Sequence, residues 1–457
     1  MRAGTHPREK FDQLVDEIDG NEGTQIAFKN LSHYSYITNL TDTQVNEIRK
    51  KDFILLVAPR FLGQHEKRWE SFPNSSNSSD DFLTSHDRSL LEPRVTVSGR
   101  SLIEQQRLIS FNRMGQPPLS AKYKRDDSEG QNVRLFMMDS GFNLEIPELR
   151  DRPGPIKTYV VPNHRFPQEH LGLKIKRNSI KDRGNHGTMM AIAAGGRTIG
   201  IVPKSDLELV KMCADYDDRR GGSKILFTVE GYQNAVDYVM DRIEEIKGRD
   251  RAAKIVVNFS GSPQRYSDPE EHENARIIWK DFIEVLAEHG VLFVVSAGND
   301  GRRGLTLAHG YITSLGTSQN NVVTVGGVLA DGSPYMDTTP EYTGHPQGGS
   351  LSLYGPVIVD IRDNTGRFVT GPNRNKGTSI GSAITAALLV YFLGIDPCNA
   401  DPEYADLERK LYRGGIPSAS KLKRYAIESS FKRTNVHPPP GLPNLNAIYN
   451  MARGRVY

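Results

Sequence analysis

The chain has 457 residues, of which 37% are hydrophobic and 25% are charged. At ~100–200 residues per domain, this length predicts about two to four domains, or one large domain with an appendage. Lys and Arg total 58 against 55 acidic residues, and this net charge of +3 provides no electrostatic footprint for nucleic acid or an anionic membrane. The longest apolar run, residues 383–395, is shorter than the ~18–20 residues of a membrane-spanning helix. We therefore expect neither nucleic acid nor a membrane span.

The first residues and the cysteines narrow the class of protein further. Residues 1–20 are interrupted by charged side chains and have no apolar core, so the chain as given predicts no secretory signal peptide. Only two cysteines occur, Cys213 and Cys398. They are too few for a disulfide-stapled mini-domain or for a zinc site built from cysteines.

The first 60 residues predict a small α+β unit. Thr41-Asp42-Thr43-Gln44 forms a capping box that starts a helix running towards Lys51. The β-branched and aromatic segments 34–38 and 53–57 predict a strand on each side of this helix. Segment 71–81, SFPNSSNSSDD, cannot bury enough apolar surface to fold, so we expect a flexible linker over 61–97 and a second domain over 98–457.

From residue 133 onward, apolar runs alternate with helical patterns. The apolar runs are Val133–Met138, Leu207–Met212, Ile255–Val257 and Val291–Val295. Apolar residues at helical spacing lie between the later runs, over 235–246 and 278–286. Continuous apolar strands separated by amphipathic helices predict a mostly parallel sheet with helices on both faces. Functional groups of such sheets gather where the strands end.

Four polar residues occupy such positions. Asp139 directly follows the first apolar run, and Asn299 closely follows the last. His186 and Ser379 each begin a stretch of small and apolar residues that predicts a buried helix. Taken singly, each has a commoner structural explanation, such as a turn residue or a helix N-cap. Their combination, in the order Asp, His, Asn and Ser, is what points to chemistry.

The motifs around these residues resemble those of the subtilisin-like (subtilase) serine proteases. They are Met138-Asp139-Ser140-Gly141, His186-Gly187-Thr188, Asn258-Phe259-Ser260, Ser296-Ala297-Gly298-Asn299 and Gly377-Thr378-Ser379. The resemblance covers roughly residues 100–450 and implies the α/β subtilisin-like fold, a mostly parallel sheet preceded by a small α+β propeptide domain. Segment 26–59 resembles the inhibitor-type propeptide of this family, with processing expected between Pro59 and Ser98.

The resemblance also implies a role for each polar residue. Ser379 Oγ would attack the peptide carbonyl, His186 would take up and later deliver the proton, and Asp139 would orient the imidazole. The Asn299 side chain and the Ser379 backbone N–H would hold the oxyanion. The expected activity is that of a serine endopeptidase working through an acyl-enzyme intermediate.

By the same resemblance, substrate binds as an extended strand between two backbone segments. The residues expected to form this site are Ser260, Gly261, Ser262, Ser296, Ala297, Gly298 and Gly222. Backbone pairing makes few demands on sequence, so the expected partners are protein and peptide substrates of broad sequence. The chain's own N-terminal propeptide is a further expected partner.

Several positions depart from the pattern of the family. Residues 380–383 read Ile-Gly-Ser-Ala where the family usually has Met-Ala-x-Pro, and Ser262 stands where glycine is usual. A serine there would narrow the primary specificity pocket. The spacing from Asp139 to His186, 186 − 139 = 47, is longer than usual and predicts an inserted loop around 160–181. No cofactor is expected to be required and no metal site is predicted; a structural calcium finds no clear set of ligands.

Two other functions compete with this one. Gly377–Gly381 also fits G-x-S-x-G, the nucleophile elbow of esterases and lipases, but that elbow needs an apolar strand before it and the order Ser, Asp, His after it. Here GPNRNK precedes the motif, and only His437 follows it. The other alternative is a catalytically degenerate subtilase that acts as a binding or regulatory module.

The localisation stays unknown from the sequence. The family is largely extracellular or vacuolar, which the absent signal peptide does not support. Sequons for N-glycosylation begin at Asn30, Asn39, Asn74 and Asn77, but such sequons are frequent by chance.

Overall fold

The computed structural model describes most of residues 123–431. Within that range, the residues outside the description are 163–173, 176–178, 183–184, 218–222, 262–268, 330, 342–348, 358–376, 397–406, 413–414 and 416. The short segments described elsewhere are 26–29, 34–37, 47–48, 95–97, 106, 109–110, 442 and 447–448.

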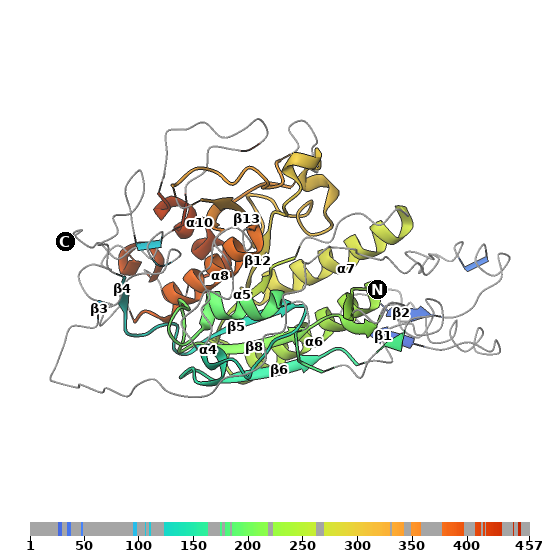
Figure 1. Cartoon of the computed structure of the whole chain (residues 1–457), viewed down its shortest axis with the longest axis horizontal. Coiled ribbons are helices and arrows are strands. Elements are labelled where there is room, and N and C mark those ends of the chain that lie inside the picture. Colours follow the sequence, from blue (N-terminus) through green and yellow to red (C-terminus); the bar gives the residue numbers. More distant parts are fainter. Residues whose placement is uncertain are drawn as a thin grey trace, which may run out of the picture.

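A seven-stranded parallel sheet forms the centre of the described region (Figure 1). Its strands are β5 (Val133–Asp139), β6 (Ile156–Val160), β8 (Asp206–Lys211), β11 (Lys254–Phe259), β12 (Leu292–Ser296), β13 (Val322–Val328) and β14 (Leu353–Pro356). Their order is β14-β13-β12-β11-β5-β8-β6, and every neighbouring pair is parallel. The central strands are buried along nearly their whole length, as their continuous apolar sequences predict.

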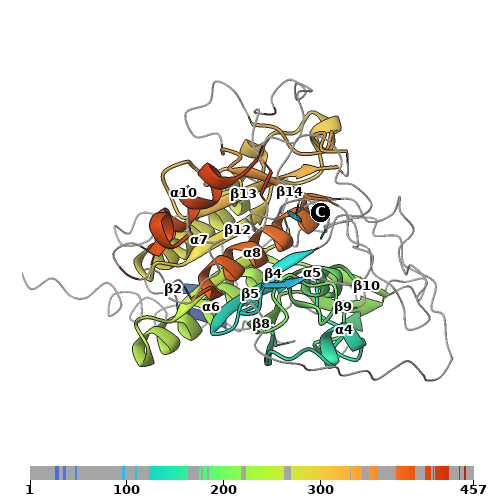
Figure 2. The same cartoon turned by 90° about the vertical axis from the view of Figure 1, so that its left-hand side faces the viewer.

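Helices cover both faces of this sheet (Figures 1 and 2). Helices α5 (His186–Gly195) and α8 (Thr378–Gly394) share one core cluster with Leu135 and Val294. Helices α6 (Val229–Arg249) and α7 (Pro269–Glu288) share the other with Phe136 and Phe293. Adjacent strand residues thus alternate between two cores, and the predicted arrangement of helices on both faces is confirmed.

Helix α8 has a special place in this architecture. It is apolar all round, every residue from Thr378 to Leu393 is buried, and it packs against β5, β11, β12, β13 and β14. Helix α10 (Ala419–Ser429) contributes Leu422 and Tyr425 to the same core. A helix that is hydrophobic on all sides belongs in the interior of a domain, and α8 therefore fixes whatever its N-terminus carries.

Smaller elements surround the sheet. The described residues form three antiparallel groups: β1 (Ile26–Lys29) with β2 (Tyr34–Ile37), β3 (Val95–Val97) with β4 (Lys124–Asp126), and β9 (Ala214–Asp217) between β7 (Lys174–Ile175) and β10 (Ser223–Leu226). The short helices are α4 (Pro147–Arg150), the 3-10 turns Gly301–Arg303 and Leu307–His309, and the π-helix Glu408–Tyr412.

The N-terminal predictions are covered only in part. The strand expected at 34–38 is β2, and residues 47–48 are helical within the expected helix. Strand β1 pairs with β2 and was not predicted. The expected strand at 53–57, the segment 71–81 and most of the linker lie outside the described residues, so the domain boundaries stay predictions.

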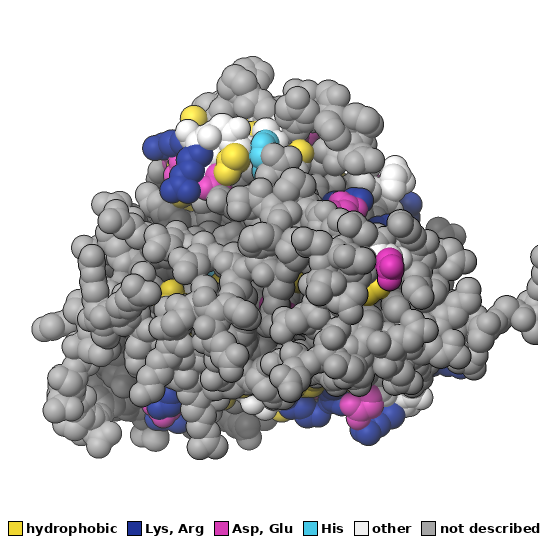
Figure 3. Space-filling view, turned by 90° about the vertical axis from the view of Figure 1, so that its right-hand side faces the viewer, with side chains coloured by type: hydrophobic (Ala, Val, Ile, Leu, Met, Phe, Trp, Pro, Cys, Tyr) yellow, Lys and Arg dark blue, Asp and Glu magenta, His cyan; other side chains and the backbone are white. Residues whose placement is uncertain are grey.

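The described surface agrees with the balanced composition. On the face in Figure 3, basic and acidic side chains of the described residues lie next to one another. None of the helices within the described ranges is long and apolar enough to cross a membrane.

Candidate active site

The carboxyl ends of β5 and β11 meet at one edge of the sheet. Phe259 in β11 lies opposite Met138 in β5 and opposite Val295 in β12. Asp139 and Ser260, the next residues, therefore lie side by side at this edge. The strand order reverses between β5 and β11, which is where open parallel sheets bind their ligands.

Asp139 and His186 form a hydrogen-bonded pair at this edge. His186 begins α5, and its Nδ1 lies 2.7 Å from Asp139 Oδ1. The same oxygen accepts the backbone N–H of Ser140 at 2.6 Å. The His186 side chain is 10% exposed and the Asp139 side chain is 5% exposed. Because an ionised carboxylate only accepts hydrogen bonds, Nδ1 carries the proton and Nε2 is the nitrogen that can take up another.

Glycine at position 187 allows this strand end and this helix to approach. A Cβ at Gly187 would lie 2.3 Å from Gly141 O and 2.9 Å from Asp139 Cβ. Asn185, just before the histidine, has φ of 57°, a left-handed conformation that asparagine adopts more readily than most residues. The sequence Asn185-His186-Gly187 thus supplies both the turn into α5 and the close contact with β5.

Ser379 and Asn299 lie together at the start of α8. Ser379 is in the first turn of this helix and is 6% exposed. The N–H and the hydroxyl of Thr378 donate to Asn299 Oδ1 at 2.9 and 3.2 Å, and the Gly298 N–H donates to that hydroxyl at 3.1 Å. Since its oxygen is held by Thr378, the Asn299 carboxamide presents its Nδ2 hydrogens as donors. Together with the helix N-terminus, they favour a negative charge beside Ser379.

The helices that carry these two groups pack against each other. Helices α5 and α8 lie in contact on the same face of the sheet. Asp139 ends β5 and Asn299 follows β12, and β11 is the single strand between them. The fold therefore brings Asp139, His186, Asn299 and Ser379 to the same edge of the sheet.

This arrangement agrees with comparisons to known proteins. The profile of the Subtilase family (Peptidase_S8) matches residues 130–394, which is more than half of the chain and spans β5 to α8. The chain belongs to the subtilase family. The resemblance inferred from the motifs is thereby confirmed for the region that carries all four residues.

Similar subtilases are identical to this chain at about a quarter of the aligned positions. It is 25% identical over 275 residues to "Subtilisin-like protease 2" of Arthroderma benhamiae, covering 60% of this chain and 53% of that protein. It is 24% identical over 309 residues to "Alkaline protease 1" of Aspergillus clavatus, covering 66% and 62%. The chain thus spans about half the length of the first of these curated relatives. A solved structure, a cold adapted subtilisin-like serine proteinase, has a TM-score of 0.48 and 15% identity, and the match covers 77% of this chain and 99% of that one.

The residues of this subtilase that were expected to bind substrate are only partly described. Ser260, Ser296, Ala297 and Gly298 are buried, Gly261 is half-buried, and Ser262 and Gly222 lie outside the described residues. A Cβ at Gly261 would lie 2.5 Å from the Phe259 ring, so the chain turns closely over that ring. The part of these residues in substrate binding stays a prediction.

The Ser260 hydroxyl faces the interior. It donates to Asn258 Oδ1 at 2.8 Å and lies 3.1 Å from Ser382 Oγ. The Ser382 hydroxyl in turn donates to the Ser379 carbonyl at 2.9 Å. Ser382 belongs to the segment that departs from the family pattern, and here it connects the end of β11 to the first turn of α8.

One buried carboxylate at this edge was missed by sequence analysis. Asp182 accepts hydrogen bonds from Ser140 and Thr188. Burial raises the pKa of Asp182, and the negative charge of Asp139 raises it further. The available signal was an acidic residue four positions before His186 and close to a helix start, a pattern too common to be singled out.

No metal site emerges from the part of the chain that the structure describes, where no three His, Cys, Asp or Glu side chains form a group able to hold an ion. That the protein requires no cofactor stays a prediction, and so does a structural calcium.

Proposed function

We propose that this chain is a serine endopeptidase that hydrolyses peptide bonds through an acyl-enzyme intermediate. The single observation that carries the proposal is the 2.7 Å contact between Asp139 Oδ1 and His186 Nδ1, at the same sheet edge as Ser379. This contact leaves Nε2 as the proton acceptor, which is the condition for a general base that activates a hydroxyl.

Each proposed residue answers one difficulty of peptide hydrolysis. A neutral hydroxyl is a weak nucleophile, so His186 removes the Ser379 proton as Oγ attacks the carbonyl carbon. Asp139 keeps the ring in the required tautomer and stabilises the imidazolium without itself becoming protonated. The tetrahedral oxyanion is held by Asn299 Nδ2 and the Ser379 backbone N–H.

The second half of the reaction uses the same groups. His186 gives its proton to the leaving amine, and the C–N bond breaks to form an ester with Ser379. Water then attacks this ester while His186 again acts as base. The carboxylic acid product leaves, and the Ser379 hydroxyl is restored.

We expect protein and peptide substrates to bind at this sheet edge. The Ser260 and Ser296 side chains are buried, which favours recognition by backbone groups of 260–262 and 296–298 and of the region around Gly222. Pairing through backbone groups supports broad specificity.

The N-terminal segment supports a second, separate part of the proposal. The β1–β2 hairpin lies against α6 in the described residues (Figure 1). We infer that residues 1–60 act as a propeptide joined through a linker over 61–97 to the peptidase domain over 98–457. Mass spectrometry of the full chain beside Ser379→Ala tests this inference: cleavage between Pro59 and Ser98 in the wild type alone is expected, and an active but uncleaved chain would contradict it.

Labelling with a fluorophosphonate probe and hydrolysis of a fluorogenic protein substrate test the activity. The wild type should be labelled and active, and Ser379→Ala should lose both properties. Ser418→Ala is the control, because Ser418 is likewise a serine at a helix N-terminus, that of α10, where it accepts the Lys421 N–H. It should keep both properties.

Other outcomes would favour the other functions. A folded wild type with neither labelling nor hydrolysis would favour a degenerate subtilase that acts as a binding module. A wild type that is labelled and cleaves esters, but no peptide bond, would favour an esterase.

A further inference from the structure

Helix α5 begins at His186 without a cap from its own N-terminal residue. Asn185, the N-cap, makes no side-chain hydrogen bond to the helix. The first N–H groups of a helix need acceptors from elsewhere, and here two are supplied by other segments. Gly187 N–H donates to Ser140 Oγ at 3.2 Å, and Thr188 N–H donates to Asp182 Oδ2 at 2.8 Å.

Asp182 takes part in the second of these contacts and is hydrogen-bonded to the acceptor of the first. Its Oδ1 accepts the Ser140 hydroxyl at 3.0 Å, and its Oδ2 also accepts the Thr188 hydroxyl at 2.7 Å. Only 9% of Asp182 is exposed. Burying a carboxyl group costs free energy unless hydrogen bonds compensate for the lost water. Movement of Ser140 or Thr188 away from Asp182 is therefore unfavourable.

These partners adjoin the two members of the proposed dyad. Ser140 follows Asp139 and donates its own N–H to the Asp139 carboxylate at 2.6 Å. Gly187 and Thr188 follow His186 in the first turn of α5. Asp182 therefore connects the strand end that carries the carboxylate to the helix start that carries the imidazole.

We propose that Asp182 is a positioning residue that holds the His186 ring against Asp139 by fixing Ser140 and the first turn of α5. This inference rests on the proposed endopeptidase function. Asp182 acts through Ser140, Gly187 and Thr188. Its Oδ2 accepts two hydrogen bonds from Thr188 in the first turn of α5. These hydrogen bonds satisfy the helix start and, through Ser140, hold Gly187 in its close contact with Asp139.

A purely structural role predicts a different result from a positioning role. Loss of a helix cap lowers stability and leaves kcat of the folded enzyme unchanged. Loss of positioning lowers kcat with little change in KM, because a misplacement of ~1 Å costs up to about 100-fold in rate. The kinetic split therefore separates the two roles.

The test compares Asp182→Ala and Asp182→Asn in the full chain. We expect kcat to fall about 10- to 100-fold in Asp182→Ala, with KM within about twofold of the wild type. Asp182→Asn should fall less, because its carboxamide can accept from Thr188 and donate to the Ser140 hydroxyl. It also serves as the folded variant should Asp182→Ala fail to fold. Ser140→Ala should add little to Asp182→Ala, because both remove the same connection.

Glu208→Gln is the matched control. Glu208 is also a buried carboxylate, 2% exposed, but it lies towards the amino end of β8 and pairs with Arg134 and Arg242. It should lower stability without changing kcat. Equal kcat in Asp182→Ala and wild type, or an equal loss of kcat in Glu208→Gln, would overturn the proposal.

A spectroscopic readout separates this proposal from the proposed function. We expect the proton between Asp139 and His186 to give a low-field NMR resonance, which depends on the hydrogen bond and can be recorded without turnover. We expect it to shift or broaden in Asp182→Ala and to persist in Glu208→Gln. An inactive wild type would end the proposed function, whereas an unchanged resonance in Asp182→Ala would end the positioning role.

Discussion

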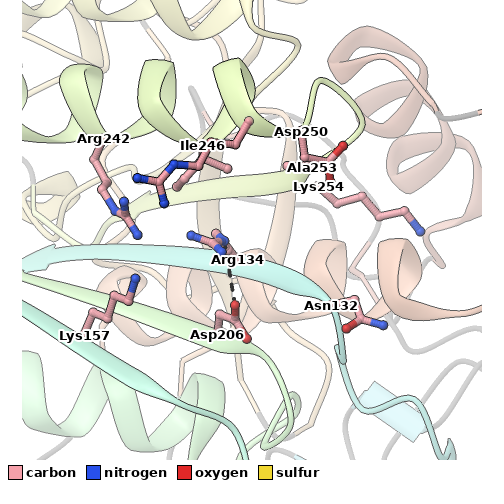
Figure 4. A pocket seen from close by; sticks show the side chains of 10 residues that line it. Asn132, Arg134, Lys157, Asp206, Arg242, Ile246, Asp250, Ala253 and Lys254 are labelled. Carbon is pink, nitrogen blue, oxygen red and sulfur yellow. Dashed lines mark ion pairs between the residues drawn. The ribbon is translucent and has the colours of Figure 1, made fainter.

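Two groups of polar side chains, one at each end of the sheet, have different partners: those at the carboxyl end are hydrogen-bonded to hydroxyl, amide and backbone groups, and those at the amino end pair with opposite charges. Asp182 and Ser260 illustrate the first pattern. The second is seen around a cavity of about 320 Å³ lined by Arg134, Asp206 and Arg242 among others (Figure 4). There Arg134 Nε lies 3.7 Å from Asp206 Oδ2, and Arg134 Nη1 lies 3.4 Å from Glu208 Oε1.

The difference shows which end can respond to a developing charge. The side chains paired at the amino end already have partners of opposite charge, so we expect their loss to affect stability and not catalysis. At the carboxyl end, Thr378 holds Asn299 Oδ1, which leaves Asn299 Nδ2 as a donor close to Ser379 and the N-terminus of α8. Substitutions at the two ends should therefore affect different measurements.

The largest effect is expected for Asp139→Asn. The carboxamide can donate to His186 Nδ1 and so favours the wrong tautomer, which lowers kcat by about 10⁴-fold in this type of triad. Steady-state kinetics checks this, with circular dichroism showing that the variant is folded. A loss below tenfold would remove Asp139 from the mechanism.

The next largest effect is expected for Asn299→Ala. Its kcat should fall about 10²- to 10³-fold, because one proposed oxyanion donor is removed. Asn321→Ala is its counterpart at the amino end, where Asn321 Nδ2 donates to Val291 O at 2.8 Å. That variant should lose stability and keep its kcat. Similar kcat values in the two variants would contradict the contrast between the ends.

Gly187→Ala should lower kcat by about 100-fold, because the new Cβ forces Asp139 and His186 apart. Gly248→Ala, in α6, is the control: a Cβ there meets nothing within 4 Å. It should raise stability by up to ~1 kcal/mol, because alanine is the better helix former. Thermal unfolding and kinetics of both variants decide the matter, and a fully active Gly187→Ala would refute the close-contact argument.

Glu208→Gln should lower the free energy of unfolding by about 1–3 kcal/mol, because Arg134 and Arg242 lose their shared anion. Urea titration measures this loss. Unchanged stability would mean that the amino-end ion pairs contribute little.

The smallest effect is expected for Arg249→Gln. Arg249 pairs with Glu245, but its side chain is 77% exposed. Exposed pairs of this kind contribute less than about 0.5 kcal/mol. The same urea titration should place this variant within error of the wild type, and a loss above 1 kcal/mol would show that the pair has a larger role.

Much of the fold could be predicted because buried parallel strands have continuous apolar sequences. The runs at 133–138, 207–212, 255–257 and 291–295 correspond to β5, β8, β11 and β12. Strand β6 was not predicted, because it lies at the sheet edge, is partly exposed and has the mixed sequence IKTYV. Strand β13 was also missed, although its sequence VVTVGGV is apolar and fully buried.

In the candidate site too, some residues could be predicted from the sequence and others could not. Asp139 and Ser379 could be placed from their positions next to apolar runs, because chain direction alone puts such residues at the functional edge. Asp182 could not, because its role depends on Ser140, 42 positions away, and on the turn into α5. Contacts of this kind follow from packing between segments and leave no local pattern.

The burial of α8 along its length has a consequence for engineering this protein. Ser379, the proposed nucleophile, stands at the first turn of a helix packed on all sides. We therefore expect a methyl group added or removed near Ala387 or Leu389 to shift α8 and, with it, Ser379. Substitutions in α8 should therefore change thermal stability and turnover together. Stabilising changes belong on outward-facing positions of α6 and α7, across the sheet from it.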